Sequence, residues 1–245
     1  MLNRPTFGGH IKLKLFITTL LALLVAGCTL EPIPEPEKEV GKIVTISATI
    51  PADTRVSYND GTGKLAWESG DKLLLAGYDG TTYKGSKIFN WNGGNTFQGE
   101  EVTGATSYKA YYPGDIITMD ANGNVNPLDA GFWQQTQSGD NTTAHLRNKL
   151  LLFDETPNPL NQTFSLALKN SIIRFDLTNV PQEVGTLSHI VWRVETAAGV
   201  FKSLPLNVTG VTFSASTNSL NAYLSFDPAA IKIIAGGEYR VALYG

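Results

Sequence analysis

The chain has 245 residues, with 19 Lys and Arg against 22 Asp and Glu, a formal net charge of −3 and a single cysteine. This charge argues against a nucleic-acid partner, whose electrostatic signature is a basic patch. One cysteine excludes an intrachain disulfide, so stability must come from core burial, for which this length suffices in one or two domains.

Residues 1–27 have the pattern of a secretory signal peptide. Basic residues precede the apolar segment 15–25, which is too short to span a bilayer as a helix. The small residue Gly27 then precedes Cys28, the arrangement that bacterial lipoprotein maturation requires. We expect cleavage between Gly27 and Cys28 and a diacylglycerol on the thiol, so that acyl chains anchor the protein to a membrane that it does not cross. The alternative is an incidental thiol beside an ordinary signal peptide.

Residues 28–41 alternate Pro and Glu, a composition that favours extended, solvated backbone, and we expect a tether here. The acidic residues close behind the cysteine also resemble signals that send some Bacteroidetes lipoproteins to the outer leaflet. An ordinary solvated linker is the alternative reading.

From Lys42 onward the hydrophobic pattern has a period of two. Val44, Ile46, Ala48 and Ile50 share one face of a predicted strand. Similar short runs recur to the C-terminus, separated by Gly and Asn turn signals. This pattern predicts an all-β fold of antiparallel sandwiches with little helix. The least regular stretch, 119–148, is predicted to be an excursion at the edge of a sheet.

Aromatic and turn residues in the first half are predicted to be framework. Trp67 occupies the inward phase beside Leu65, and Gly70-Asp71 turns into the apolar run 73–75. Pro113 ends a strand because it lacks the amide hydrogen of the ladder. The alternative is that these aromatic residues form a sugar-stacking surface.

An enzyme is not expected, and neither is a cofactor or a metal site. His145 is predicted in a polar loop and His189 in the outward phase of a strand, whereas zinc needs three or four close ligands. Nucleophile-elbow and phosphate-loop motifs are missing. The stretch 120–124 has calcium-ligand residue types without the glycine and glutamate of an EF-hand loop.

An ordered set of motifs resembles the N-terminal domain of the Bacteroidales fimbrillins, the FimA-like and Mfa-like pilins. The set comprises Thr54-Arg55, residues 65–72 (LAWESGDK), Phe97, residues 105–113 (ATSYKAYYP), Gln135-Thr136 and residues 164–175 (FSLALKNSIIRF). The resemblance covers about residues 42–194. Asn170 departs from it, since relatives often carry a histidine there, at a position that looks structural.

The resemblance implies two β-sandwich domains with Greek-key, transthyretin-like topology, at 42–180 and 181–245. It also implies a structural or accessory subunit of fimbriae at the cell surface, on the outer membrane, with a role in adhesion to host or bacterial receptors. Its partners would be other pilin subunits, joined by donor-strand exchange, a form of β-augmentation.

Residues 42–50 are the strand that could leave in such an exchange. Their single apolar face suits either a native edge strand or an expelled pro-strand, and the loop that follows offers a protease the Arg55–Val56 bond. Alternatively, Arg55 is only a motif residue paired with an acid.

The second domain is shorter than in pilins of this family, and the chain stops within an alternating run at 239–245. We expect a truncated gene model or a fragment. If the chain is complete, a cap, anchor or accessory role is favoured. The competing hypothesis is a non-polymerising surface lipoprotein that binds glycans through Trp91 or Trp133.

Overall fold

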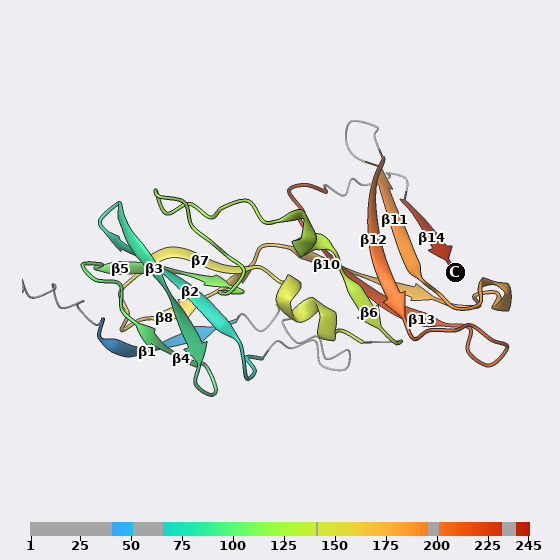
Figure 1. Cartoon of the computed structure of the whole chain (residues 1–245), viewed down its shortest axis with the longest axis horizontal. Coiled ribbons are helices and arrows are strands. Elements are labelled where there is room, and N and C mark those ends of the chain that lie inside the picture. The colour runs from blue at the N-terminus through green and yellow to red at the C-terminus, as the bar shows by residue number, and fades with distance from the viewer. Residues whose placement is uncertain (1–40, 51–65, 141, 196–200, 232–238) are drawn as a thin grey trace, which may run out of the picture. The chain divides into compact units, whose positions relative to one another are not determined.

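Short strands dominate the chain, as the alternating hydrophobic pattern predicts. The computed structural model describes residues 41–50, 66–140, 142–195, 201–231 and 239–245 (Figure 1). Its strands are β1 (Ile43–Thr49), β2 (Lys72–Asp79), β3 (Thr82–Trp91), β4 (Thr96–Glu100), β5 (Ser107–Tyr112), β6 (Thr136–Ser138), β7 (Leu152–Asn158), β8 (Thr163–Ser165), β9 (Ala167–Leu168), β10 (Ser171–Leu177), β11 (His189–Glu195), β12 (Phe201–Thr209), β13 (Leu220–Phe226) and β14 (Tyr239–Tyr244). Three 3-10 helices accompany them: η1 (Ala130–Trp133), η2 (Ala144–Lys149) and η3 (Gln182–Val184). The all-β prediction is confirmed.

No helix among the described residues has the length and apolar character needed to cross a membrane.

The first sheet has eight strands in the order β8-β1-β4-β3-β2-β5-β7-β9. Its two end strands are consecutive in the chain, because β8 ends at Ser165 and β9 begins at Ala167. The carboxylate of Asp154 on β7 also accepts a hydrogen bond from the Ser165 amide on β8, at 2.9 Å. The sheet therefore curls around a core of its own.

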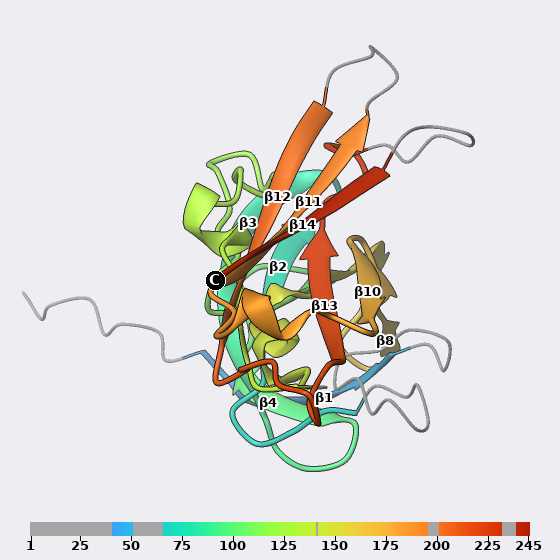
Figure 2. The ribbon, with the colours of Figure 1, turned by 90° about the vertical axis from the view of Figure 1, so that its right-hand side faces the viewer.

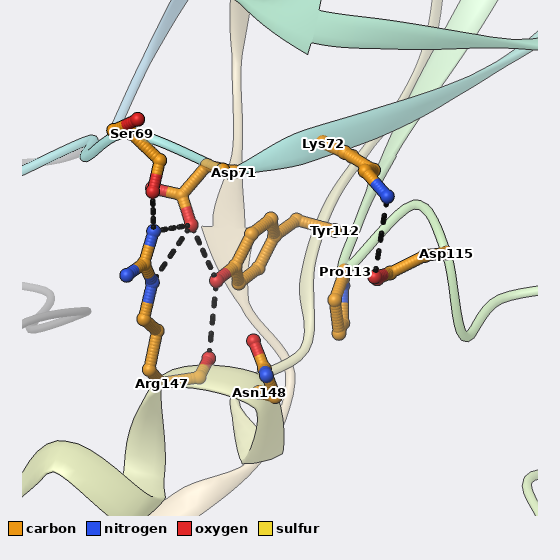
Figure 3. A pocket seen from close by; sticks show the side chains of 9 residues that line it. Ser69, Asp71, Lys72, Tyr112, Pro113, Asp115, Arg147 and Asn148 are labelled. Atoms are coloured by element: carbon orange, nitrogen blue, oxygen red, sulfur yellow. Dashed lines mark hydrogen bonds and ion pairs between the residues drawn. The ribbon is translucent and has the colours of Figure 1, made fainter.

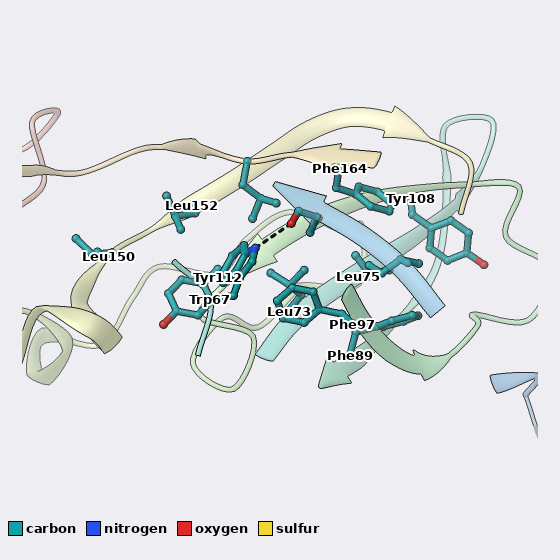
Figure 4. Close-up of a cluster of buried hydrophobic side chains, with 14 of the residues drawn as sticks. Trp67, Leu73, Leu75, Phe89, Phe97, Tyr108, Tyr112, Leu150, Leu152 and Phe164 are labelled. Atoms are coloured by element: carbon teal, nitrogen blue, oxygen red, sulfur yellow. Dashed lines mark hydrogen bonds between the residues drawn. The ribbon is translucent and has the colours of Figure 1, made fainter. Parts of the chain in front are cut away.

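Large buried side chains fill that core (Figure 4). Trp67 lies at its centre, with ring centroids 5.0 Å from Phe97 and 5.4 Å from Tyr112 in edge-to-face geometry. Trp67 is 7% exposed, so its prediction as an inward-facing framework residue is confirmed. Other members are Ile46, Ala48, Leu73, Leu75, Phe89, Tyr108, Leu150, Leu152, Phe164 and Leu166.

The outer face of this sheet is covered as well. Leu74 and Tyr78 alternate with the core residues of β2 and pack against Ile117 and Phe132 in a second apolar cluster. Ile117 and Phe132 belong to the irregular part of the chain between β5 and β7. The prediction that the stretch 119–148 is an excursion at a sheet edge holds for β6, which is an end strand of another sheet, but is wrong for the part around Phe132, which packs on the outer face of the first sheet.

Two further sheets enclose another core. A two-stranded sheet, β10-β13, lies opposite a four-stranded sheet with the order β14-β11-β12-β6. Figure 2 shows β12, β11 and β14 side by side. Trp192 on β11 is 2% exposed and packs against Phe175 and Phe226 of the opposing sheet. The predicted domain boundary at residue 180 stays a prediction. Strand β10, before this residue, pairs along its length with β13, after it.

Candidate functional site

Strand β1 lies between two partners in the first sheet. It pairs antiparallel with β4 from Ile43↔Glu100 to Ser47↔Thr96, and parallel with β8 from Ser47↔Thr163 to Thr49↔Ser165. The reading of residues 42–50 as an edge strand therefore fails at residues 47–49, where β8 adds a second partner, while the ladder of residues 43–46 is with β4 alone. Removal of β1 would leave a slot with unpaired backbone along β4 and along the short strand β8.

The side chains of β1 divide as the sequence predicts. Ile46 is 2% exposed and Ala48 fully buried in the first core, and Val44 and Ile50 pack against that core from the ends of the strand. Ile43, on the opposite face, is 55% exposed. Each large aliphatic side chain buried in this way contributes about 1.5–3 kcal/mol relative to exposure, so an empty slot favours a replacement strand with the same alternation.

Trp67 holds the C-terminal end of β1. Its indole Nε1 donates a hydrogen bond to the Ala48 carbonyl at 2.8 Å (Figure 4). The Ala48 amide donates to the Asn95 carbonyl at 2.8 Å, and the Thr49 carbonyl accepts from the Leu166 amide at 3.0 Å. The C-terminal end of β1 is thus bonded to the Trp67 indole, to Asn95 and to Leu166.

Asp71 organises a polar cluster beside Trp67 (Figure 3). Its buried carboxylate accepts hydrogen bonds through Oδ1 from Arg147 Nε at 3.1 Å, from Arg147 Nη2 at 2.9 Å and from the Tyr112 hydroxyl at 3.0 Å. Its Oδ2 accepts from the Glu68 amide at 2.7 Å. Arg147 Nη2 also donates to the Ser69 carbonyl at 2.7 Å. These bonds connect the loop 66–71 to helix η2.

Burial and the charge of Asp71 determine the protonation states of Tyr112 and Arg147 in this cluster. Burial, followed by the charge of Asp71, raises the pKa of the Tyr112 phenol well above its usual range, so the phenol stays protonated and donates. The same hydroxyl reaches the Arg147 carbonyl at 3.1 Å. Burial opposes the charge on Arg147, but the hydrogen bond and charge of Asp71 outweigh it, so the pKa of the guanidinium is raised. These cluster bonds join the loop that carries Trp67 to η2, and Tyr112 also packs edge to face against the Trp67 ring.

Four residues predicted as processing sites lie outside the described residues. They are Gly27 and Cys28, at the expected lipidation site, and Arg55 and Val56, at the expected protease site. Residues 51–65 connect β1 to the loop that carries Trp67.

The two histidines among the described residues do not share a site, because their contacts are with different residues. His145 lies in η2, not in a polar loop as predicted, and its Nε2 donates to the Tyr223 carbonyl at 2.8 Å. His189 faces outward on β11, as predicted, and stacks on Tyr244 with ring centroids 4.4 Å apart. Among the described residues, no group of three or more His, Cys, Asp or Glu side chains is placed to hold a metal ion.

Asp120 has a local structural role. Its Oδ1 accepts from the amides of Asn122 and Asn124, both at 2.8 Å, and its Oδ2 accepts from the Asn124 side chain at 3.0 Å. Hydrogen bonds from Asn124 are the main cause that lowers the pKa of this carboxyl. This is the arrangement of an Asx turn.

Comparisons with known proteins show low similarity. No family model and no curated protein sequence matches the chain. Among solved structures, a fimbrial protein from Bacteroides ovatus is 13% identical with a TM-score of 0.38, and covers 81% of this chain and 44% of its own. A putative cell adhesion protein from Bacteroides eggerthii is 11% identical with a TM-score of 0.33, and covers 83% of this chain and 80% of its own. The chain thus spans less than half the length of the Bacteroides ovatus protein.

Proposed function

We propose that this chain is a cell-surface lipoprotein of the fimbrillin type, a structural or accessory subunit of fimbriae with a role in adhesion. The observation that carries the proposal is the position of β1: a short strand, held between β4 and β8, whose apolar face completes the first core. The motif resemblance from Thr54-Arg55 to residues 164–175 supports the same class.

Assembly by strand exchange follows from this position. A cut after Arg55 removes the covalent link between β1 and the rest of the sheet. The strand is then held only by ladder hydrogen bonds and by burial of residues such as Ile46 and Ala48. When it leaves, β4 and β8 expose unpaired backbone and the core opens, so a strand from another subunit binds by β-augmentation.

The polar cluster around Asp71 prepares the slot for this exchange. Loop 66–71 is tied to η2 through Arg147 and Tyr112, and these residues make none of their cluster bonds with β1. Trp67 lies in this loop and also packs against Phe97 and Tyr112, so in this proposal its indole N–H binds a carbonyl of the incoming strand in place of that of Ala48. A preformed binding slot lowers the conformational-entropy cost of binding the new strand.

Lipid attachment at Cys28 places the subunit on the outer membrane in this proposal. The Cys28→Ser variant should lose attachment, because the serine hydroxyl does not form the thioether. Metabolic labelling with palmitate followed by fractionation measures this directly. Label that persists in the serine variant would show that Cys28 is not the lipidated residue.

Protease treatment tests strand release. The purified protein is incubated with a trypsin-like protease, the new N-terminus is identified, and size is followed by light scattering. We expect Val56 as the new terminus and a shift from monomer to oligomer, with neither change in Arg55→Ala. If Val56 never appears, or appears while the protein stays monomeric, Arg55 is only a motif residue and an uncleaved accessory role replaces this mechanism.

A further inference from the structure

A groove of about 540 Å³ lies where four segments of the chain meet. Pro127, Leu128 and Trp133 come from the segment that covers the first sheet. Leu151 directly precedes β7, and Phe153 and Glu155 belong to it. Lys169 and Asn170 precede β10, and Asp227 and Ala229 follow β13. The volume is within the range of small-ligand sites, roughly 300–1,000 Å³, and such sites favour junctions between packed units.

Two half-buried aromatic rings form the apolar part of the groove. Trp133 contacts Phe132 edge to face, with ring centroids 4.8 Å apart. Phe153 contacts Tyr111 in the same manner at 5.0 Å. Phe132 and Tyr111 are themselves buried, so these contacts fix the planes of both groove rings before any ligand arrives.

The polar groups of the groove are also positioned in advance. Lys169 Nζ and Glu155 Oε2 form an ion pair at 2.6 Å, with both side chains about half exposed. The Asp227 Oδ1 accepts from the Ala229 amide at 2.8 Å, which orients the carboxylate. These groups provide hydrogen-bond donors and acceptors beside the aromatic rings, with two carboxylates and one ammonium.

This combination selects the chemistry of a ligand. An anionic ligand is disfavoured by two carboxylates against one ammonium, and a hydrocarbon chain by the polar groups. An added peptide strand is disfavoured because the backbone of Phe153 is already paired with Tyr111 on one side and Ala167 on the other. A pyranose ring fits: it presents an apolar C–H face to an indole and hydroxyls to carboxylate and ammonium groups.

We propose that this groove binds an uncharged oligosaccharide, with one sugar ring stacked on Trp133 and its hydroxyls bonded to Glu155, Lys169 and Asp227. Of the two tryptophans that the sequence offers as sugar platforms, Trp91 does not line this groove, and its Nε1 donates to the Gly94 carbonyl at 2.9 Å. The site is independent of strand exchange at β1, and neither proposal needs the other.

A glycan array probed with the labelled, purified protein tests the proposal, followed by calorimetry with the best-bound neutral oligosaccharide. We expect Trp133→Ala to weaken binding at least about tenfold, which corresponds to about 1.4 kcal/mol. Trp91→Ala is the matched control and should bind within about twofold of the parent. Circular dichroism establishes that both variants are folded.

A second pair of variants keeps the test decisive if Trp133→Ala fails to fold. Asp227→Asn removes the charge of a half-buried carboxylate and Lys169→Met removes an exposed ammonium, and each should weaken binding at least about threefold. The proposal is overturned if the array shows no neutral glycan, if peptides or anionic glycans bind instead, or if Trp133→Ala binds like the parent. Equal losses in Trp91→Ala and Trp133→Ala would also overturn it.

Discussion

The side-chain amide of Gln135 hydrogen-bonds to the backbone of Ser225 as a neighbouring strand would. Its Oε1 accepts from the Ser225 amide at 2.9 Å, and its Nε2 donates to the Ser225 carbonyl at 2.6 Å. Two residues on, Gln137 bonds in the same way to the Tyr223 amide at 3.0 Å and the Asn221 carbonyl at 2.8 Å. Strand β6 thus pairs with β12 through its backbone, while the side chains of Gln137 in the strand and Gln135 just before it cover the edge of β13.

Replacing Gln135 should therefore destabilise the second core. Gln135→Leu keeps the approximate volume but leaves the buried Ser225 amide and carbonyl without these partners, so we expect a loss of about 2–4 kcal/mol in the free energy of unfolding. Urea titration measures this loss. Gln134→Leu, at the exposed neighbouring position, is the control and should change stability by less than about 0.5 kcal/mol. Equal effects would argue against the strand-like role of Gln135.

Trp67→Ala should destabilise the protein by about 3–5 kcal/mol, the usual cost of truncating a large buried aromatic residue. Trp67→Phe retains much of the packing but loses the hydrogen bond to the Ala48 carbonyl. Its loss of stability should therefore be smaller than that of Trp67→Ala and greater than zero. Thermal unfolding of the purified protein gives both values. A loss below about 1 kcal/mol for Trp67→Ala would contradict its placement at the centre of the core.

The Asp71–Arg147 ion pair should contribute more to the stability of the fold than a surface ion pair does. Asp71 is buried, and three hydrogen bonds converge on its Oδ1. A double-mutant cycle with Asp71→Asn and Arg147→Met should give a coupling energy of about 1–2 kcal/mol. The same cycle on the exposed pair Lys84–Asp79, with atoms 3.8 Å apart, should give less than about 1 kcal/mol. Similar values for the two pairs would show that Asp71 does not organise loop 66–71.

Protonation of His145 should lower stability in mild acid. Burial lowers the pKa of this imidazole below its ordinary value of 6.5, and its buried Nδ1 has no hydrogen-bond partner among the described residues. Since the unfolded chain binds the proton more tightly, the free energy of unfolding falls as the pH drops below about 6.5 towards the folded-state pKa. Denaturant titrations at a series of pH values should show a smaller fall for His145→Gln than for His189→Gln. An identical slope in both variants would exclude His145 as the responsible group.

Local periodicity predicted much of the fold. The alternation of Val44, Ile46, Ala48 and Ile50 defined which face of β1 is buried, and the phase of Trp67 placed it in the core. Both inferences needed only near neighbours in the sequence, because successive side chains on a strand point to opposite faces.

Contacts between residues far apart in the chain could not be predicted from the sequence. β1 was compatible with an edge position because its partners β4 and β8 lie far along the chain, and nothing local specifies pairing on both sides. The sequence around Arg147 did not indicate its role in the polar cluster, because its ion-pair partner Asp71 belongs to a distant turn. The spacing of Gln135 and Gln137, two polar residues on one face of a short strand, was a visible sign of a shared partner, but it did not identify β13.

Locking β1 in its slot tests the central claim most directly. Thr45 and Gln98 are opposite each other on β1 and β4, and both are exposed. Opposed positions in an antiparallel pair are close enough for a disulfide, so Thr45→Cys with Gln98→Cys, in a Cys28→Ser background, should hold β1 after cleavage at Arg55. We predict that the cleaved, oxidised protein stays monomeric by light scattering and that adding reductant to the same sample produces oligomers. Oligomers that form equally under both conditions would contradict strand exchange at β1.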